Sequence, residues 1–472
     1  MSFDSPIYIV FLIGVCLAYW RLRYRPQNLV LLLASYFFYG WWDWRFLALM
    51  IASTTVDFLL ARAIDTAQSQ QARKRFMLTS VVLNLAVLGV FKYFNFFVDS
   101  FLHVANAVGL AGLPRIVWSI VLPPAISFYT FQEIAYIVDV YERRVPRARN
   151  YIDYALFVSL FPHLIAGPIQ KPSHLLPQIQ SPRSWNPTKA FDGMLLVLEG
   201  LVRKSVVADN CGLVANAAFN GSFGSHNLPV TLLGVYAFAW QIYGDFSGYS
   251  SIARGSAQLL GFHFMVNFRQ PYLATSLQDF WRRWHISLST FLRDYLYIRL
   301  LGGNRLGRVR TYINLLLTML LGGLWHGANW TFVAWGGMHG AALAAERMLR
   351  GTALASPDLG PILGRWTRRV VVFHFVCLTW VFFRATTFSS AATMLAGVRV
   401  FHWEHVYGIA ALFLAMSVVP LLLVDLELER ANVEYLFEHH GYPLRVCTGL
   451  VFIVVITLFA ANSQSAFIYF QF

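Results

Sequence analysis

The chain has 472 residues, of which 57% are hydrophobic and only 13% are charged. A soluble domain carries about 25% charged residues, so this composition, with a mean hydropathy of +0.53, excludes an ordinary soluble enzyme. The net charge of +14 comes from short basic clusters between apolar runs, a pattern typical of loops that set membrane topology. We therefore expect a lipid bilayer, and no nucleic acid, as the partner of this chain.

Apolar runs close to the roughly 20 residues needed to cross a bilayer recur to the C-terminus, which one signal peptide cannot explain. The first candidate spans are residues 6–20, 28–42, 46–63, 77–97 and 116–140. Every second loop between them is basic. By the positive-inside rule these loops are cytoplasmic, and the N-terminus lies on the periplasmic side.

The middle of the chain is less regular. The apolar stretches here contain prolines, charges or paired glycines, or are too long for one span: 151–165, 190–219, 228–264 and 311–349. Interrupted or polar helices at membrane depth are tolerated only where protein or a water-filled cavity surrounds them. The sequence therefore predicts a functional cavity formed within residues 160–345.

The last third is regular again and adds candidate spans at 366–383, 406–424 and 444–461. We expect one integral membrane domain over 1–472, with both termini in the periplasm. Its predicted parts are N-terminal spans (1–150), a catalytic region (151–345), C-terminal spans (346–462) and an aromatic tail (463–472).

The first candidate site is the segment DFWRRWHISLSTFLRDYLY at 279–297, which contains His285. On a continuous helix, Arg282 and Arg293 share one face, and Arg283 and Asp294 share another, where they could pair. A third face is an apolar stripe made of Trp281, Trp284, Leu288, Phe291 and Tyr295. The pattern fits an interfacial helix with its aromatic side in lipid. It also fits a grip on a phosphorylated cofactor, because arginine binds phosphate bidentately.

The second candidate is His326 in Gly322-Gly-Leu-Trp-His-Gly-Ala-Asn-Trp330, which follows an almost wholly apolar run. A titratable group at membrane depth is costly and by default a functional hypothesis, and histidine suits acid–base work near neutral pH. The alternative is a hydrogen-bonded packing histidine. His339 lies about 220° further round a continuous helix and is expected on a different face. No HExxH or similar spacing occurs, so we expect no catalytic metal.

Two further polar features remain. Gln241, Asp245 and Ser247 lie inside an apolar run, where they could form a cavity wall or hydrogen-bond between helices. The tail, Ala466 to Phe472, has four aromatic residues, one of which is Tyr469. It could anchor the terminus at the membrane interface, or fold back to present the Tyr469 hydroxyl at the cavity mouth.

Taken together, these segments resemble the membrane-bound O-acyltransferase superfamily. They are most similar to its bacterial polysaccharide branch, which includes the membrane proteins of alginate O-acetylation and teichoic-acid D-alanylation. The matching segments are WRRWHISL (281–288), FLRDY (291–295), GLWHGA (323–328), QIYGDFSGYS (241–250), FPHLIAGPIQ (161–170), FYGW (38–41) and FIYFQF (467–472). The resemblance covers nearly the whole chain.

The resemblance implies a ring of tilted helices around a central tunnel, with about 10–12 spans and short re-entrant or interfacial helices. His326 matches the catalytic histidine of the superfamily. His285 matches a second signature position, which is Asn, Asp or His across the superfamily. Acetyl-CoA would enter from the cytosol. His326 would act as base and His285 as oxyanion or orientation partner, beside tunnel or donor-binding residues at Trp284, Trp325, Arg282, Arg283, Arg293, Asp294, Gln241, Asp245 and Ser247.

The implied activity is O-acetylation of a secreted polysaccharide, of alginate or cellulose type, at the bacterial inner membrane. By analogy with the D-alanylation system, Tyr469 would accept the acyl group and pass it to a periplasmic SGNH-hydrolase-like acetyltransferase. Three alternatives stay open: a transporter, which also uses broken helices, a scaffold subunit of an export complex, and an acyltransferase that acts on lipid or protein.

Overall fold

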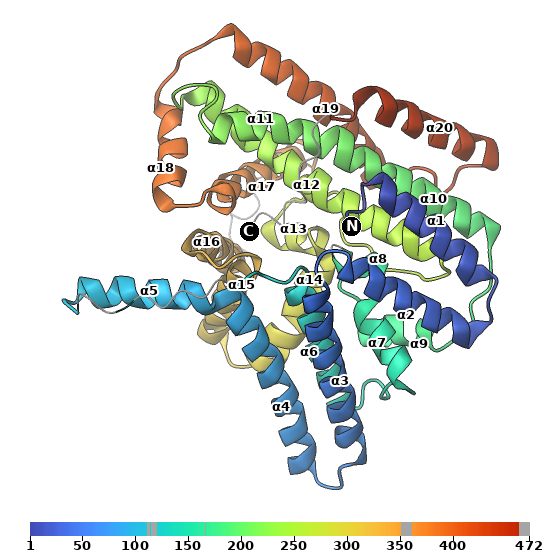
Figure 1. The fold of residues 1–472 in the computed structure, drawn as a ribbon. Coiled ribbons are helices and arrows are strands. Elements are labelled where there is room, and N and C mark those ends of the chain that lie inside the picture. The colour runs from blue at the N-terminus through green and yellow to red at the C-terminus, as the bar shows by residue number, and fades with distance from the viewer. Residues whose placement is uncertain (111–113, 115–119, 166, 351–360, 462–472) are drawn as a thin grey trace. The chain divides into compact units, whose positions relative to one another are not determined.

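Helices make up the secondary structure of this protein (Figure 1), whose computed structural model describes residues 1–110, 114, 120–165, 167–350 and 361–461. No strand occurs among these residues. Five of the described helical stretches are long and apolar enough to cross a membrane: Trp44–Thr66, Gln70–Ala107, Ile362–Arg384, His405–Ala431 and Tyr442–Phe459. The predicted all-α polytopic membrane fold is confirmed. The ring, the tunnel and the number of spans stay predictions.

The chain divides into two compact units. The first comprises Met1–Ala190 and Ser256–Phe264, and the second comprises Phe191–Gly255 and Met265–Phe472. Both histidines of the predicted site belong to the second unit. The subdivision into functional parts stays a prediction.

The first unit contains α1 (Pro6–Trp20), α2 (Tyr24–Gly40), α3 (Trp44–Thr66), α4 (Gln70–Leu88), η1 (Gly89–Tyr93), α5 (Phe94–Ala107), α6 (Ile126–Tyr141), α7 (Tyr151–Ser159), α8 (Phe161–Leu164) and α9 (Pro172–Ile179). Side-chain caps begin several of them; Ser5 and Ser69, for example, accept from Tyr8 N and Ala72 N, which satisfies N–H groups that a helix start leaves open. Within the span predicted at 116–140, the described residues 120–125 are not helical and α6 begins at Ile126. It follows Pro123 and Pro124, which disfavour helix in the residue before them.

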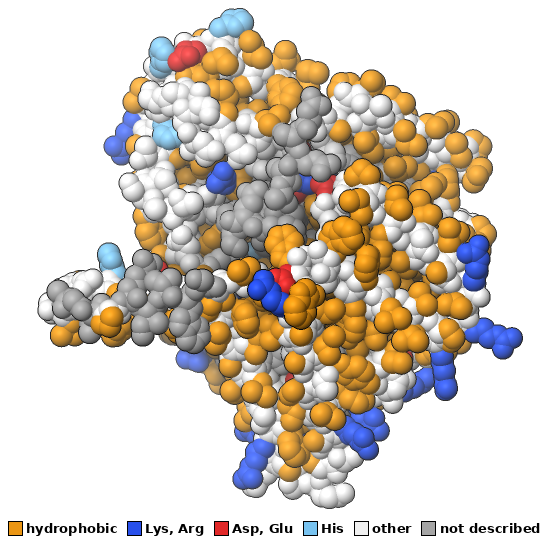
Figure 2. All heavy atoms as spheres, in the orientation of Figure 1, with side chains coloured by type: hydrophobic (Ala, Val, Ile, Leu, Met, Phe, Trp, Pro, Cys, Tyr) orange, Lys and Arg blue, Asp and Glu red, His pale blue; other side chains and the backbone are white. Residues whose placement is uncertain are grey.

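Hydrophobic side chains cover most of the described surface in the view of Figure 2. In the first unit, Lys and Arg side chains lie at the α1–α2 turn, which contains Arg21 and Arg23, and near the start of α4, which contains Lys74 and Arg75. An apolar flank with charged ends is the surface expected of helices that cross a bilayer.

The second unit takes most of α10 (Pro187–Leu201), then η2 (Val202–Ala208), α11 (Asp209–Phe219), α12 (Leu228–Leu259), η3 (Pro271–Leu273), α13 (Leu277–Arg283), α14 (Ile286–Phe291), η4 (Leu292–Leu300), α15 (Arg308–His326), α16 (Trp330–Leu349), α17 (Pro361–Arg384), α18 (Phe388–Ala396), η6 (Gly397–Arg399), α19 (His405–Ala431) and α20 (Tyr442–Phe459). Among these, η2 and η4 are π-helical turns. Such turns are rare and often occur at functional sites.

Helix α12 runs without interruption for 32 residues, although the sequence led us to expect a break near its glycines. Those glycines serve close approach to another helix instead. A Cβ built on Gly248 would lie 2.7 Å from Gly200 O, and one on Gly255 would lie 2.3 Å from Gly193 O. Small residues at such contacts let two helix backbones pack directly against each other. The polar face of α12 is therefore held tightly against α10.

Helices α15 and α16 form an antiparallel hairpin (Figure 1). Here too, glycines allow the approach, since a Cβ on Gly323 would lie 2.2 Å from Phe332 O and one on Gly336 would lie 2.1 Å from Met319 O. The predicted interruption of 311–349 is confirmed, and it lies at Gly327, whose extended backbone ends α15. Asn329 then caps α16 by accepting from Thr331 N at 3.0 Å. The hairpin places His326 at the tip of a helix.

Candidate active site

His285 lies at a sharp break between two short helices. Trp284 is extended, and His285 adopts a left-handed conformation with φ +42°, which few non-glycine residues do. The break is stabilised by Asn267, whose backbone oxygen accepts from Ile286 N at 2.9 Å and whose Oδ1 accepts from Ser287 N at 3.1 Å. These two bonds satisfy N–H groups at the start of α14.

The break overturns the continuous helix predicted for 279–297. The predicted pairing of Arg283 with Asp294 is wrong, because the two residues no longer share a face. Arg283 instead donates to Asp279 at 2.8 Å and to Glu429 at 2.5 Å, while Asp294 pairs with its neighbour Arg293. Arg283 thus ties α13 to α19.

The imidazole of His285 is fully buried. Its Nδ1 lies 3.2 Å from Asn267 Oδ1. Its ring contacts Phe246, with centroids 4.5 Å apart, and Trp325, with centroids 6.1 Å apart. His285 lies outside the candidate spans, and burial lowers the pKa of its imidazole to about 3. The ring is therefore neutral at physiological pH.

His326 lies in an aromatic surround at the C-terminal end of α15. Its ring is 4.9 Å from that of Trp325, 5.1 Å from Trp335 and 5.3 Å from Phe383, measured between centroids. Only 5% of its surface is exposed. Trp325 contacts both His326 and His285, so the structure brings the two predicted catalytic residues together on one indole ring.

His339 is closer to this site than the sequence indicated. The prediction that His339 cannot share a face with His326 assumed one continuous helix, whereas the two residues lie on separate helices, α15 and α16. Both rings contact Trp335, that of His339 at 4.9 Å. The Nε2 of His339 lies 3.0 Å from Thr379 Oγ1, which ties α16 to α17.

A cavity of about 600 Å³ lies beside these residues. Arg282 and Arg293 both line it, although the continuous helix that was predicted to give them a common face is broken between them. Its further basic residues, which the sequence reasoning missed, are Arg305, Arg347 and Arg350; Glu346 is the acidic residue in the same lining. The basic stretch at 305–310 and the arginines that end α16 were the available signal, but nothing in the sequence shows that they meet. The cavity reaches Ile286, which follows His285, and Trp281, whose ring is 5.7 Å from that of Trp335.

Asp245, one of the polar residues of α12, pairs with a buried lysine that the sequence did not single out. Lys204 Nζ lies 3.0 Å from Asp245 Oδ1 and 2.7 Å from Asp209 Oδ1. Gln241 packs close to Gly212, where a Cβ would lie 2.9 Å from its Nε2. Ser247 lines a small polar pocket. A basic residue in the interrupted 190–219 stretch was the signal that could have indicated Lys204.

Trp284 is 1% exposed and belongs to an aromatic core. Its ring stacks on Phe280 at 5.6 Å and contacts Phe268 and Trp380, each at 5.1 Å. Trp284, which precedes His285 in the chain, is therefore held in place by this core.

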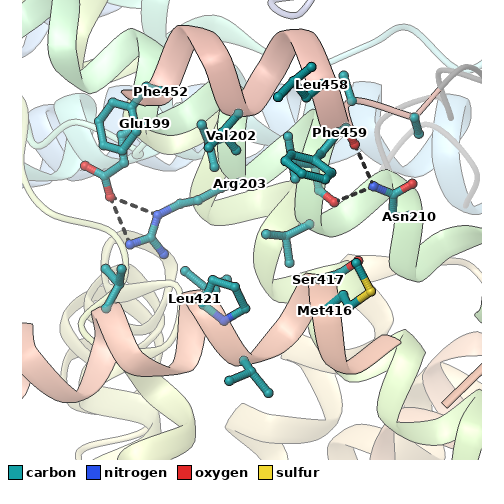
Figure 3. Close-up of a pocket in the computed structure, with 18 of the residues that line it drawn as sticks. Glu199, Val202, Arg203, Asn210, Met416, Ser417, Leu421, Phe452, Leu458 and Phe459 are labelled. Carbon is teal, nitrogen blue, oxygen red and sulfur yellow. Dashed lines mark hydrogen bonds and ion pairs between the residues drawn. The ribbon is translucent and has the colours of Figure 1, made fainter. Parts of the chain in front are cut away.

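A second and larger cavity, about 1100 Å³, lies among α10, η2, α11, α19 and α20 (Figure 3). At one end Arg203 donates to Glu199 at 2.9 Å, and at the other Asn210 donates to Phe459 O at 2.9 Å. Its remaining lining is almost wholly apolar. Neither His285 nor His326 is among its described lining residues, so the acyl-transfer site is not expected there.

Tyr469 lies outside the described residues. In the part of the chain that the structure describes, no group of three or more His, Cys, Asp or Glu is placed to hold a metal ion. Among the described residues, the site brings together two histidines, a set of aromatic rings and a cavity rich in arginine.

Comparison with known proteins shows the family of this chain. The model of the membrane-bound O-acyltransferase family matches residues 142–384, which include both histidines and the arginine cavity. The chain belongs to the membrane-bound O-acyltransferase family. It is therefore an acyltransferase.

Named relatives in this family come from several bacteria. The chain is 39% identical to the probable alginate O-acetylase of Pseudomonas putida, over the full length of both chains. It is 35% identical to the peptidoglycan O-acetyltransferase of Helicobacter pylori, over 84% of this chain and 80% of that one. It is 28% identical to the teichoic acid D-alanyltransferase of Streptococcus thermophilus, over 55% of this chain and 67% of that one. The resemblance to the bacterial polysaccharide branch of membrane-bound O-acyltransferases is confirmed.

Proposed function

We propose that this protein transfers acetyl groups from acetyl-CoA to a secreted polysaccharide at the bacterial inner membrane. The observation that carries the proposal is the contact of His285 and His326 with one indole ring, that of Trp325, beside a cavity rich in arginine. The names of the relatives support acetyl as the acyl group and a polysaccharide such as alginate as the acceptor.

The arginine cavity is the proposed donor site. Five arginines against one glutamate in its lining suit the phosphates of acetyl-CoA, because a planar guanidinium binds phosphate bidentately. The pantetheine arm would then run past Ile286 and Trp281 toward the histidines. Arg283 and Asp294, proposed from the sequence as donor residues, would act by holding α13 and Arg293 in place.

The reaction needs a base for the hydroxyl and stabilisation of the negative charge on the carbonyl oxygen. In the proposed reaction, His326 removes the proton from the acceptor hydroxyl as its oxygen attacks the thioester carbon. The C–S bond then breaks, and the thiolate of coenzyme A takes a proton from His326. His285 serves as the oxyanion or orientation partner.

The acceptor is proposed to be reached in two steps. Tyr469 takes the acetyl group at the periplasmic side, and an SGNH-hydrolase-like partner carries it to the polymer. The family resemblance and the aromatic tail around Tyr469 support this relay. A direct transfer to the polysaccharide would need the same two histidines.

The experiment is acetyl transfer from radiolabelled acetyl-CoA to the purified protein, with and without the periplasmic partner and polymer. The variants are His326→Ala and Tyr469→Phe, and the control is His402→Ala, which removes an exposed histidine that pairs with the exposed Glu404. Label on the wild type and the control, lost in both variants, supports the enzyme and the relay. If the Tyr469→Phe protein is still labelled while the His326→Ala protein is not, the relay is rejected. A wild type that transfers nothing reopens the transporter and scaffold alternatives.

A further inference from the structure

The side-chain amide of Asn267 lies at the centre of the hydrogen bonds around His285. It is 1% exposed. Its Oδ1 accepts from Ser287 N at 3.1 Å and from Ser287 Oγ at 2.9 Å, and lies 3.2 Å from His285 Nδ1. Its Nδ2 donates to Ser250 Oγ at 3.1 Å. Both ends of the amide thus have buried partners.

The backbone N–H of Ser287 determines which way the amide points. An N–H can only donate, so the atom that faces it must be the oxygen of Asn267, and the flipped amide would place two donors together. The same oxygen then faces His285 Nδ1. A carbonyl oxygen has no proton to give, and an unprotonated Nδ1 would turn its lone pair toward it. The attractive arrangement has the proton on Nδ1.

We propose that Asn267 is a positioning residue that holds His285 in the Nδ1–H tautomer and so makes Nε2 a hydrogen-bond acceptor. The inference rests on the role proposed for His285 and decides between its two forms. A neutral ring with its proton on Nδ1 cannot donate from Nε2 to an oxyanion. It can accept from an N–H or O–H group of the substrate, which makes His285 the orientation partner.

The backbone supports the same assignment. Asn267 O accepts from Ile286 N at 2.9 Å, so the residue holds the turn on both sides of His285 as well as the ring. Among the described residues, the rings of Phe246, Phe268 and Trp325 lie against His285 and do not titrate. His326 lies against the same Trp325. Burial keeps the imidazole neutral, as the lowered pKa of His285 indicates.

The tautomer can be measured without any enzymatic activity. The chain has 13 histidines, and a spectrum of ¹⁵N-histidine-labelled protein in nanodiscs, compared with that of His285→Gln, identifies the His285 ring. The expected signals are a protonated Nδ1 and an unprotonated Nε2. The opposite tautomer would overturn the proposal.

The second test is the pH profile of acetyl transfer by Asn267→Asp. The new carboxylate can still accept from Ser287 N–H, Ser287 Oγ and His285 Nδ1–H, so the hydrogen bonds that Asn267 Oδ1 accepts are kept. A carboxylate beside the ring favours the imidazolium and so raises the pKa of His285. As the pH is lowered, the variant should therefore lose activity at a higher pH than the wild type does. At a given pH well below the raised pKa of His285, the activity relative to its maximum should be about tenfold lower for each unit by which the pKa has risen.

The matched control is Ser250→Ala, which removes the partner of Nδ2 and leaves Oδ1 facing His285. Its pH profile should follow that of the wild type. An acid limb that stays in place in a folded Asn267→Asp protein contradicts the proposal, and if that variant does not fold, the NMR result decides. A wild type that transfers nothing at any pH would instead reject the proposed function, and the tautomer measurement would still stand.

Discussion

Lys204 and Asp245 form an ion pair, Nζ to Oδ1 3.0 Å, in which the lysine side chain has no exposed surface. Asp209 shares the same lysine. Removing one member of a buried pair leaves a charge without compensation, which costs about 3–5 kcal/mol. Lys204→Met should therefore lower the free energy of unfolding by about that amount, measured by thermal or denaturant unfolding in detergent.

The control for this prediction is Arg144→Met, which breaks an exposed pair with Glu142. Such pairs contribute less than about 1 kcal/mol. Adding Asp245→Asn to Lys204→Met should recover part of the loss. If Lys204→Met and Arg144→Met lower the free energy of unfolding equally, the buried pair contributes no more to stability than the exposed one.

The arginine cavity predicts a defect in donor binding. Arg282→Ala and Arg305→Ala should each raise the KM for acetyl-CoA by about tenfold, with a smaller change in kcat, because a hydrogen bond to a charged group contributes about 1.5–3 kcal/mol. Initial rates over a range of acetyl-CoA concentrations measure this. Arg430→Ala, on the exposed end of α19, is the control. An unchanged KM in both cavity variants would place the donor elsewhere.

The α15–α16 hairpin should not tolerate a methyl group at its contact. Gly336→Ala would place a Cβ 2.1 Å from Met319 O, and backbone atoms cannot yield as a side chain can. The helices would separate and displace His326 and Trp335, so transfer should fall by at least about tenfold, since misplacement by about 1 Å can cost 10²-fold. Gly14→Ala, where nothing lies within 4 Å, should keep wild-type activity and Tm.

The aromatic rings around His326 predict the length of the acyl group. Trp335 and Phe383 lie 5.1 Å and 5.3 Å from its ring, which leaves little space for a chain longer than acetyl. Phe383→Ala opens such space. One extra methylene on a substrate in an apolar pocket changes kcat/KM by about 10–200-fold. The ratio of kcat/KM for butyryl-CoA to that for acetyl-CoA should rise in this variant. An unchanged ratio would mean that Phe383 does not border the acyl group.

The sequence predicted the membrane fold and the two histidine segments because long apolar runs and isolated polar groups are local signals. It could not predict the break at His285, since the bonds that stabilise the turn come from Asn267, outside the segment. The Arg283–Asp294 pairing failed for that reason. The buried partner of Asp245 and three of the cavity arginines were missed because they are distant in sequence and meet only through tertiary packing.

The left-handed backbone of His285 also limits what can replace it. β-Branched residues are strained in that conformation, whereas Asn, Asp and His are the side chains that adopt it most readily after glycine. These are the three residue types that the family resemblance assigns to this position. The turn and the chemistry thus select the same small set of side chains, so a residue of suitable reactivity but unsuitable backbone preference, such as threonine, would fail here through the shape of the chain alone.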